Sequence, residues 1–153
     1  MTGWAELPGN LLDLAVAFLL GIPIGWDREH RGWGPGLRTY PLLAMGACAY
    51  IEIGEIAFTD HIEGQARFFQ ALVSGIGFIG AGAIIKGRVE IYGLATAVSL
   101  WVTVSVGVAA SYQLYPLAAV LSATTLVALR LLKPLKIHPE EADRNPVDPN
   151  QSS

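Results

Sequence analysis

The feature that most constrains this chain is an apolar run at residues 68–85, which contains no charged residue. A helix of that length, rising 1.5 Å per residue, crosses most of the hydrocarbon core of a bilayer. Its centre, residues 74–82, reads Ser-Gly-Ile-Gly-Phe-Ile-Gly-Ala-Gly. Glycine costs about 1 kcal/mol against alanine inside a helix, and small residues in membrane helices let backbones touch. The run therefore predicts a membrane helix enclosed on two sides, with packing positions at Gly75, Gly77, Gly80 and Gly82.

The composition places the chain among polytopic membrane proteins, because 52% of its residues are hydrophobic and only 15% are charged. Apolar runs predict five transmembrane helices at about residues 11–25, 40–58, 68–85, 91–111 and 115–132. We expect these to form one all-α bundle, a single transmembrane domain over residues 1–136. Residues 137–153 are acidic and rich in Pro, Asn and Ser, and are expected to form a disordered polar tail.

The basic residues predict the orientation of these helices. Five spans put the termini on opposite sides, and basic residues favour the cytoplasm. With the N-terminus outside and the C-terminus cytoplasmic, nine of the ten Lys and Arg residues are cytoplasmic, and only Arg67 is outside. Membrane lipids are accordingly expected partners of this surface.

Three carboxylates fall toward the outer ends of the predicted spans: Asp13, Glu52 and Glu55. Carboxylates buried in a membrane are costly and are candidates for function, and such a cluster with water suits Mg²⁺ or a proton. The alternative is that the two glutamates lie at headgroup depth in water. No metal site is assigned, and no cofactor is expected beyond Mg²⁺ as a candidate ligand.

Charged residues also gather at the cytoplasmic ends of the first four spans. One interpretation is that these charges only set the orientation of the helices and contact lipid phosphates. The other is an ion-paired latch, in which Arg28 and Arg38 bind Asp27, Glu29 or Glu90 and fix how the helices meet. The residues assigned to this motif are Asp27, Arg28, Glu29, Arg38, Thr39 and Arg88.

Small residues elsewhere mark further helix contacts. The first span contains Gly21 and Gly25, four residues apart. In the fourth span small residues recur every four positions and include Ser99, Thr103 and Gly107, a stripe suited to meeting the third span.

Catalytic arrangements are missing from the sequence, so an enzyme is not expected. No Ser or Cys is placed beside a His, and no Cys/His metal spacing occurs. The pattern Gly-x-Gly-x-x-Gly beginning at Gly75 lacks the acidic residue that nucleotide binding needs about 20 positions later. The basic residues have no aromatic residues interleaved with them, so nucleic-acid binding is not expected.

Four motifs in order resemble the MgtC/SapB family of bacterial inner-membrane proteins. Residues 25–29 resemble the family's Gly-Leu-Glu-Arg-Glu, and residues 35–39 its Ala-Gly-Leu-Arg-Thr. Residues 74–82 are similar to Ser-Gly-Ile-Gly-Phe-Leu-Gly-Ala-Gly, and residues 93–101 to Gly-Leu-Thr-Thr-Ala-Ala-Ser-Leu-Trp. The departures from these motifs include Trp26, Asp27 and Pro35.

The resemblance implies five transmembrane helices in the bacterial inner membrane and a link to magnesium homeostasis, growth in low magnesium and virulence. It also implies a regulator, whose founding member is thought to restrain the proton-driven ATP synthase. We therefore expect a non-enzymatic regulator that binds a membrane protein such as ATP synthase, or a second copy in a homodimer or small homo-oligomer. The alternative is a small oligomeric transporter or channel for Mg²⁺ or another cation.

Overall fold

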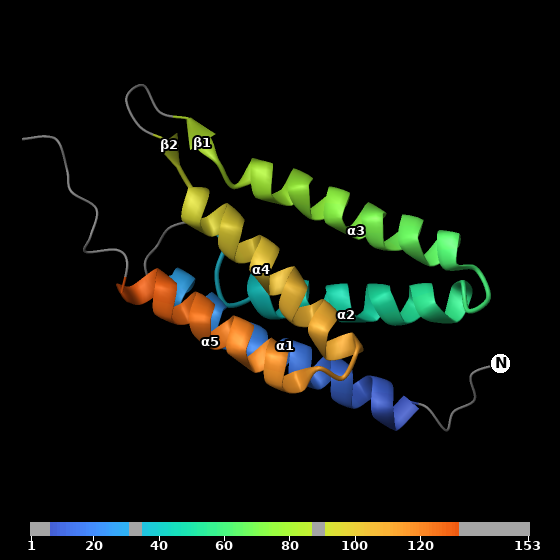
Figure 1. Cartoon of the computed structure of the whole chain (residues 1–153). Coiled ribbons are helices and arrows are strands. Elements are labelled where there is room, and N and C mark those ends of the chain that lie inside the picture. The colour runs from blue at the N-terminus through green and yellow to red at the C-terminus, as the bar shows by residue number, and fades with distance from the viewer. Residues whose placement is uncertain (1–6, 31–34, 87–90, 132–153) are drawn as a thin grey trace, which may run out of the picture.

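The computed structural model describes residues 7–30, 35–86 and 91–131, which form five helices and one short hairpin (Figure 1). The elements in chain order are α1 (Leu7–His30), α2 (Thr39–Ala57), α3 (Ile62–Gly82), β1 (Ile85–Lys86), β2 (Ile91–Tyr92), α4 (Leu94–Ser111) and α5 (Tyr115–Leu131). The strands are antiparallel, with Ile85 opposite Tyr92. The five-helix fold predicted from the sequence is confirmed, and the hairpin was not predicted.

The centre of the molecule is α4, not the glycine-rich helix. Ten of the residues of α4 are buried, whereas α3 buries only Ile76. Figure 1 shows α4 crossing the bundle between α3 and the other helices, with α1 and α5 side by side. The reason lies in the side chains, since α4 carries small or apolar residues on every face and can therefore be surrounded.

Two helices are longer than the apolar runs that predicted them. Residues 27–30 lie beyond the first predicted span, which ended at residue 25, and they form the last turn of α1, because no Pro or Gly interrupts the helix there. The third helix begins at Ile62, six residues before the start of the predicted span. Glu63 lies in its first turn, where a negative charge favours the helix dipole.

Three of the predicted packing glycines do allow close contact between helices. A Cβ on Gly21 would lie 2.7 Å from the Cα of Pro41, and one on Gly25 would lie 3.1 Å from the Cα of Leu37. A Cβ on Gly107 would overlap the carbonyl oxygen of Ala44. These glycines bring α1 and α4 against α2 or the residues just before it.

The expectation that α3 is enclosed on two sides is wrong for the single chain. Gly75, Gly77 and Gly82 have no atom within 4 Å of a would-be Cβ, and Gly80 reaches only Ala97, at 3.9 Å. The helix packs through one side, where Ile76 joins the core. The glycines of α3 could let another backbone come close, but no backbone of the described residues lies beside them.

The small-residue stripe of α4 also meets a different neighbour from the one predicted. Ser99 is hydrogen-bonded to Tyr40 of α2, and Gly107 lies against Ala44 of α2. Thr103 is fully buried and donates to the carbonyl of Ser99. The stripe therefore serves the contact between α4 and α2 rather than the contact with α3.

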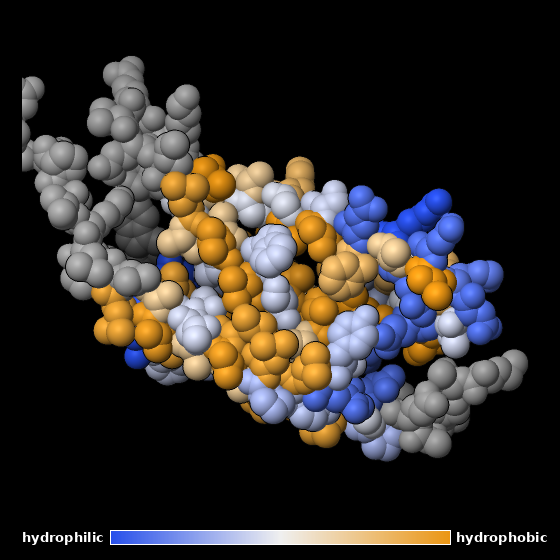
Figure 2. All heavy atoms as spheres, viewed as in Figure 1, coloured by the Kyte–Doolittle hydropathy of each residue, from blue (hydrophilic) through white to orange (hydrophobic). Residues whose placement is uncertain are grey.

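Two described helices are long and apolar enough to cross a membrane, over Pro8–His30 and Leu94–Ser111, and α5 is apolar but shorter. Large apolar side chains are exposed along all five helices. In Figure 2 they spread over the middle of the visible face, while hydrophilic residues gather at the end where α2 turns into α3. This distribution is typical of a helix bundle in contact with lipid.

Candidate functional site: two polar clusters along the α1–α5 contact

Three polar contacts fix how α1 and α5 lie against each other. Tyr115 donates to Asp13 near the start of both helices, and Arg130 contacts Asp27 near the end of both. Between them, the hydroxyl of Ser122 donates to the carbonyl of Leu20 at 2.7 Å. The partners are always 102 or 103 residues apart. The two helices therefore run parallel, with a polar contact about every two turns.

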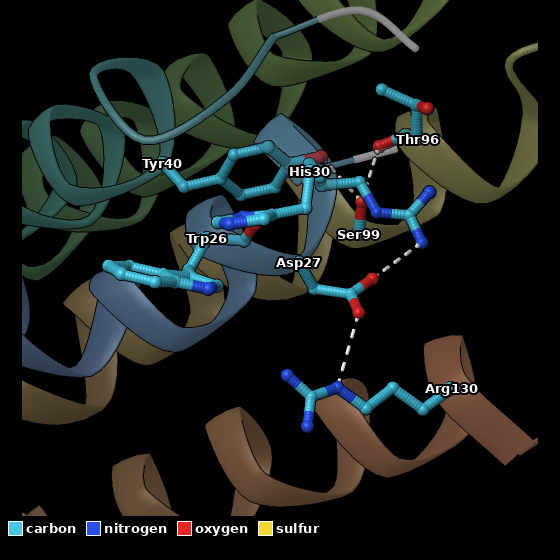
Figure 3. A network of polar contacts seen from close by, with 8 residues as sticks. Trp26, Asp27, His30, Tyr40, Thr96, Ser99 and Arg130 are labelled. Carbon is cyan, nitrogen blue, oxygen red and sulfur yellow. Dashed lines mark hydrogen bonds and ion pairs between the residues drawn. The ribbon is translucent and has the colours of Figure 1, made fainter. Parts of the chain in front are cut away.

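The Asp27 cluster, which consists of Asp27, Arg28 and Arg130, closes one end of this contact. Asp27 is only 5% exposed, and its carboxylate lies 3.2 Å from Nε of Arg130 and 3.4 Å from a terminal nitrogen of Arg28. Figure 3 shows Asp27 on α1 facing Arg130 on α5. The carboxylate thus ties the two helices together through charge-assisted hydrogen bonds.

The two arginines of this cluster differ in their surroundings. Arg28 is 7% exposed, and its Nε has no hydrogen-bond partner among the described residues. The side chain of Arg130 is 55% exposed. Removing a guanidinium from water is costly unless a carboxylate is close, so Arg28 depends on Asp27. Arg130 remains accessible to other anions.

A second polar contact lies beside the Asp27 cluster. The Tyr40 hydroxyl and the Ser99 hydroxyl are 2.7 Å apart, and Ser99 donates to the carbonyl of Thr96 at 2.8 Å (Figure 3). Because the Ser99 hydroxyl donates its proton to that carbonyl, the Tyr40 hydroxyl is the donor to Ser99. This chain of bonds connects the start of α2 to α4 within reach of the charges of Arg28 and Asp27.

The remaining residues of the predicted latch have other roles or lie outside the described residues. Glu29 accepts a hydrogen bond from the backbone N–H of Leu37 at 2.9 Å and so closes the connection to α2. Arg38 and Thr39 are exposed, and Arg38 forms no ion pair with a described residue. The pairing of Arg38 predicted with Asp27 or Glu29 is not seen, and Arg130 contacts Asp27 instead; the predicted pairing of Arg38 with Glu90 is not tested by the described residues. Arg88 and Glu90 lie outside the described residues, as does the tail at 137–153.

The Asp13 cluster, which consists of Asp13, Tyr115, Cys48 and Glu52, lies at the other end of α1. Asp13 is 4% exposed and accepts a hydrogen bond from Tyr115. Glu52 accepts one from Cys48 at 3.3 Å and is close enough to Asp13 for their charges to interact. Glu55 is exposed and lies near Tyr112. In the part of the chain that the structure describes, no three or more His, Cys, Asp or Glu side chains converge on a metal position.

Sequence reasoning identified one partner of the Asp13–Tyr115, Asp27–Arg130 and Ser99–Tyr40 contacts, both partners of the Asp27–Arg28 pair, and neither partner of the Ser122–Leu20 contact. The residues singled out were Asp13, Asp27, Arg28 and Ser99. Those not singled out were Tyr115, Ser122 and Tyr40. Arg130 was used only as one of the basic residues that predict the orientation. The available signal was the similar spacing of polar residues on two apolar helices, Asp13 to Asp27 and Tyr115 to Arg130. That spacing does not say which two helices are neighbours.

The family profile named MgtC family matches residues 14–137, which include the Asp27 cluster and all of α2, α3, α4 and α5. This chain belongs to the MgtC family. "Protein MgtC" of Brucella abortus (strain 2308) is 39% identical over 132 residues, which cover 86% of this chain and 55% of that relative. The resemblance seen in the four sequence motifs is thereby confirmed.

Other MgtC family relatives have different names. The Escherichia coli (strain K12) protein called "Putative magnesium transporter YhiD" is 33% identical over 131 residues, covering 82% of this chain and 61% of that protein. Protein SrpB of Synechococcus elongatus is 32% identical over 146 residues, covering 87% of this chain and 78% of that protein. The chain thus spans little more than half the length of the MgtC proteins it matches. No solved structure matches the chain.

Proposed function

We propose that this MgtC family member is a non-enzymatic regulator of the bacterial inner membrane, which acts by binding another membrane protein through the outward face of α3. The observation that carries the proposal is the open space around Gly75 and Gly82, which lie seven residues apart on one face of α3. Each costs about 1 kcal/mol against alanine in a helix, and neither gains a contact within the described chain. Such glycines are useful where a second backbone comes close, as membrane helices do when they associate.

The proposed orientation puts the N-terminus outside and the Asp27 cluster at the cytoplasmic surface. Nine of the ten basic residues then face the cytoplasm. The parallel course of α1 and α5 supports an odd number of spans, since the first and fifth of five alternating helices run in the same direction. Arg130, with its exposed side chain, would lie among the phosphates of the inner leaflet.

The regulatory role is proposed to concern magnesium homeostasis, and in pathogens virulence, as the family resemblance implies. A proton-driven ATP synthase is one candidate for the partner, and a second copy of the chain is another. Affinity capture from native membranes grown in low and in high magnesium tests both. The proposal expects one membrane protein, or the chain itself, to be enriched in a magnesium-dependent manner.

A matched pair of variants tests whether α3 is the binding face. Gly75→Leu places a large side chain on the outward face, and Gly46→Leu places the same side chain on α2, where the position is equally open. Capture should fall at least tenfold for Gly75→Leu and stay unchanged for Gly46→Leu. Equal capture by the two variants would remove α3 as the docking face.

A cation transporter is the second candidate, and the Asp13 cluster favours it. A carboxylate that is 4% exposed in a membrane helix is costly and commonly marks an ion or proton path. Magnesium flux into liposomes containing the purified protein separates the two functions. The regulator proposal expects no flux above that of empty liposomes. Flux that is lost in Asp13→Asn and kept in Asp60→Asn would instead establish transport.

A further inference from the structure

The three charged side chains of the Asp27 cluster leave an excess of one positive charge. The guanidiniums of Arg28 and Arg130 both contact the carboxylate of Asp27, at 3.4 Å and 3.2 Å. Arg28 is buried, its Nε has no hydrogen-bond partner in the described part of the chain, and the carboxylate beside it is shared with Arg130. A second anion beside the cluster would therefore be stabilised by the charge that one carboxylate leaves over.

Arg130 is the member of the cluster that an anion from outside can reach. Its side chain is 55% exposed, and its contact with Asp27 is made through Nε. A guanidinium has five N–H donors, four of them on the two terminal nitrogens. Figure 3 shows Nε as the nitrogen nearest to the Asp27 carboxylate, with the terminal nitrogens beyond it. Asp27 therefore orients the guanidinium and leaves its terminal nitrogens able to bind two phosphate oxygens at once.

The surroundings of Arg130 suit a phosphate that belongs to a lipid. Leu131, the next residue, and Val127, one turn closer to the middle of α5, are large apolar side chains that are exposed. On α1 the residue before Asp27 is Trp26, which is about half exposed. Tryptophan in membrane proteins gathers at the depth of the lipid headgroups. A phosphate bound to Arg130 would thus lie at headgroup depth, with apolar protein surface beside it for acyl chains.

We propose that the Asp27 cluster binds the phosphate group of an anionic phospholipid through Arg130. The terminal nitrogens of Arg130 donate to phosphate oxygens, Asp27 orients the guanidinium, and Arg28 adds positive potential from the interior. The acyl chains lie along α5 beside Val127. This rests on the membrane placement in the proposed function, but not on a regulatory role. Because Asp27 and the phosphate bind the same guanidinium, the lipid becomes a third partner in the contact between α1 and α5.

The test counts the lipids that stay bound to the full-length protein. The protein is purified in dodecyl maltoside, a neutral detergent, and titrated with dioleoyl phosphatidylglycerol, and native mass spectrometry measures the fraction that retains lipid. Dioleoylglycerol, which has the same chains without phosphate, and inorganic phosphate, which has no chains, are titrated in parallel. We expect the apparent affinity for phosphatidylglycerol to exceed that for each of the other two about fivefold or more.

A matched pair of arginine variants locates the site. Arg130→Gln removes the exposed guanidinium of the cluster, whereas Arg38→Gln removes an exposed arginine that forms no ion pair with a described residue. The apparent affinity for phosphatidylglycerol should fall about fivefold in Arg130→Gln, the usual effect of one basic residue at a lipid phosphate, and stay unchanged in Arg38→Gln. Arg130→Lys, which keeps the charge but not the planar fork, should fall between the wild type and Arg130→Gln.

The variant Asp27→Asn separates phosphate binding from a structural role of Arg130. Arg130→Gln and Asp27→Asn both remove the ion pair between α1 and α5. If lipid retention only reflected that helix contact, both variants would lose it. In the proposed site Asp27 competes with the phosphate for Arg130, so Asp27→Asn should raise the apparent affinity for phosphatidylglycerol about fivefold. Should Asp27→Asn fail to fold, the comparison of Arg130→Gln with Arg38→Gln still decides the proposal.

Equal affinities for phosphatidylglycerol and dioleoylglycerol in the wild type would overturn the proposal, because the phosphate would then contribute nothing. Equal retention by Arg130→Gln and Arg38→Gln would overturn it too, as would loss of retention in folded Asp27→Asn. Binding of inorganic phosphate that matches that of the lipid, and is lost in Arg130→Gln, would keep the phosphate site but overturn its assignment to a lipid. Partner capture through Gly75 is measured separately, so the site can fail while the proposed function stands, and the reverse also holds.

Discussion

Asp27 is placed so that its carboxylate serves two helices at once. It accepts from Arg130 of α5, and it is the carboxylate nearest to the buried guanidinium of Arg28. Arg28 has little water around it and an Nε without a described partner. The charge of Asp27 therefore matters more for Arg28 than for Arg130, whose side chain is half exposed and can be solvated without it.

Asp27→Asn should lower the free energy of unfolding by about 3 kcal/mol, because it leaves the Arg28 guanidinium buried without a counter-charge. Unfolding by sodium dodecyl sulfate in mixed micelles measures the change. Asp60→Asn is the control, since Asp60 is exposed in the turn between α2 and α3, and should change stability little. Equal stability of the two variants would show that Arg28 does not need Asp27.

Tyr40→Phe should cost about 1 kcal/mol, the usual value for one hydrogen bond, because Ser99 loses its donor in a buried position. Tyr50→Phe provides the comparison. Tyr50 lies in the same helix and stacks on Phe68 at a centroid distance of 4.0 Å, an interaction that phenylalanine can retain. The same unfolding assay should rank Tyr40→Phe clearly below Tyr50→Phe, and a reversed order would contradict the role of the Tyr40–Ser99 contact.

At the scale of the elements, glycines of the same sequence pattern serve opposite purposes in α4 and α3. In α4 the backbone of α2 lies where a side chain of Gly107 would be, so the glycine is required by the fold. In α3 no atom of the described residues lies within 4 Å of the position that a Cβ on Gly75 would take. The first kind of glycine stabilises the bundle, and the second only weakens its own helix until another molecule arrives.

This contrast predicts opposite effects of one substitution. Gly107→Ala should destabilise the protein by about 3 kcal/mol, since its methyl group would overlap the Ala44 carbonyl and force α2 and α4 apart. Gly75→Ala should stabilise the isolated protein by up to about 1 kcal/mol. Thermal unfolding in detergent compares them directly. A neutral Gly107→Ala would mean that α2 and α4 are not in backbone contact.

The same contrast shows which parts of the structure could be predicted from the sequence. Apolar runs reveal five helices, and adjacent residues such as Asp27 and Arg28 can be recognised as a pair. A small-residue period shows which face of α4 is flat, but it does not identify the helix that lies against that face, which is α2. The partner of Asp27 is 103 residues away, and only the packing of α1 on α5 brings Arg130 to it.

At the scale of the whole molecule, the parallel course of α1 and α5 links the polar clusters to the proposed topology. Asp13 and Asp27 are 14 residues apart on one helix, which is about 21 Å and most of a bilayer. One cluster should therefore lie near each surface of the membrane. The cluster with two arginines belongs on the cytoplasmic side, where basic residues concentrate, and the carboxylate cluster belongs outside.

Reporter fusions test this arrangement. Alkaline phosphatase, which is active only outside, should be active when fused after Asp60 or Gln113 and inactive after Pro35 or Ser153. Green fluorescent protein at the same positions should give the complementary pattern. Five alternating helices place the connection after α1 and the C-terminus on the same side of the membrane. Finding Pro35 and Ser153 on opposite sides would therefore contradict the number of spans. It would also contradict the parallel pairing of α1 with α5 across the membrane. If all four fusions gave the opposite result, the five-helix bundle would stand but its orientation would be reversed. The arginines would then lie outside, contrary to the rule that basic residues concentrate on the cytoplasmic side.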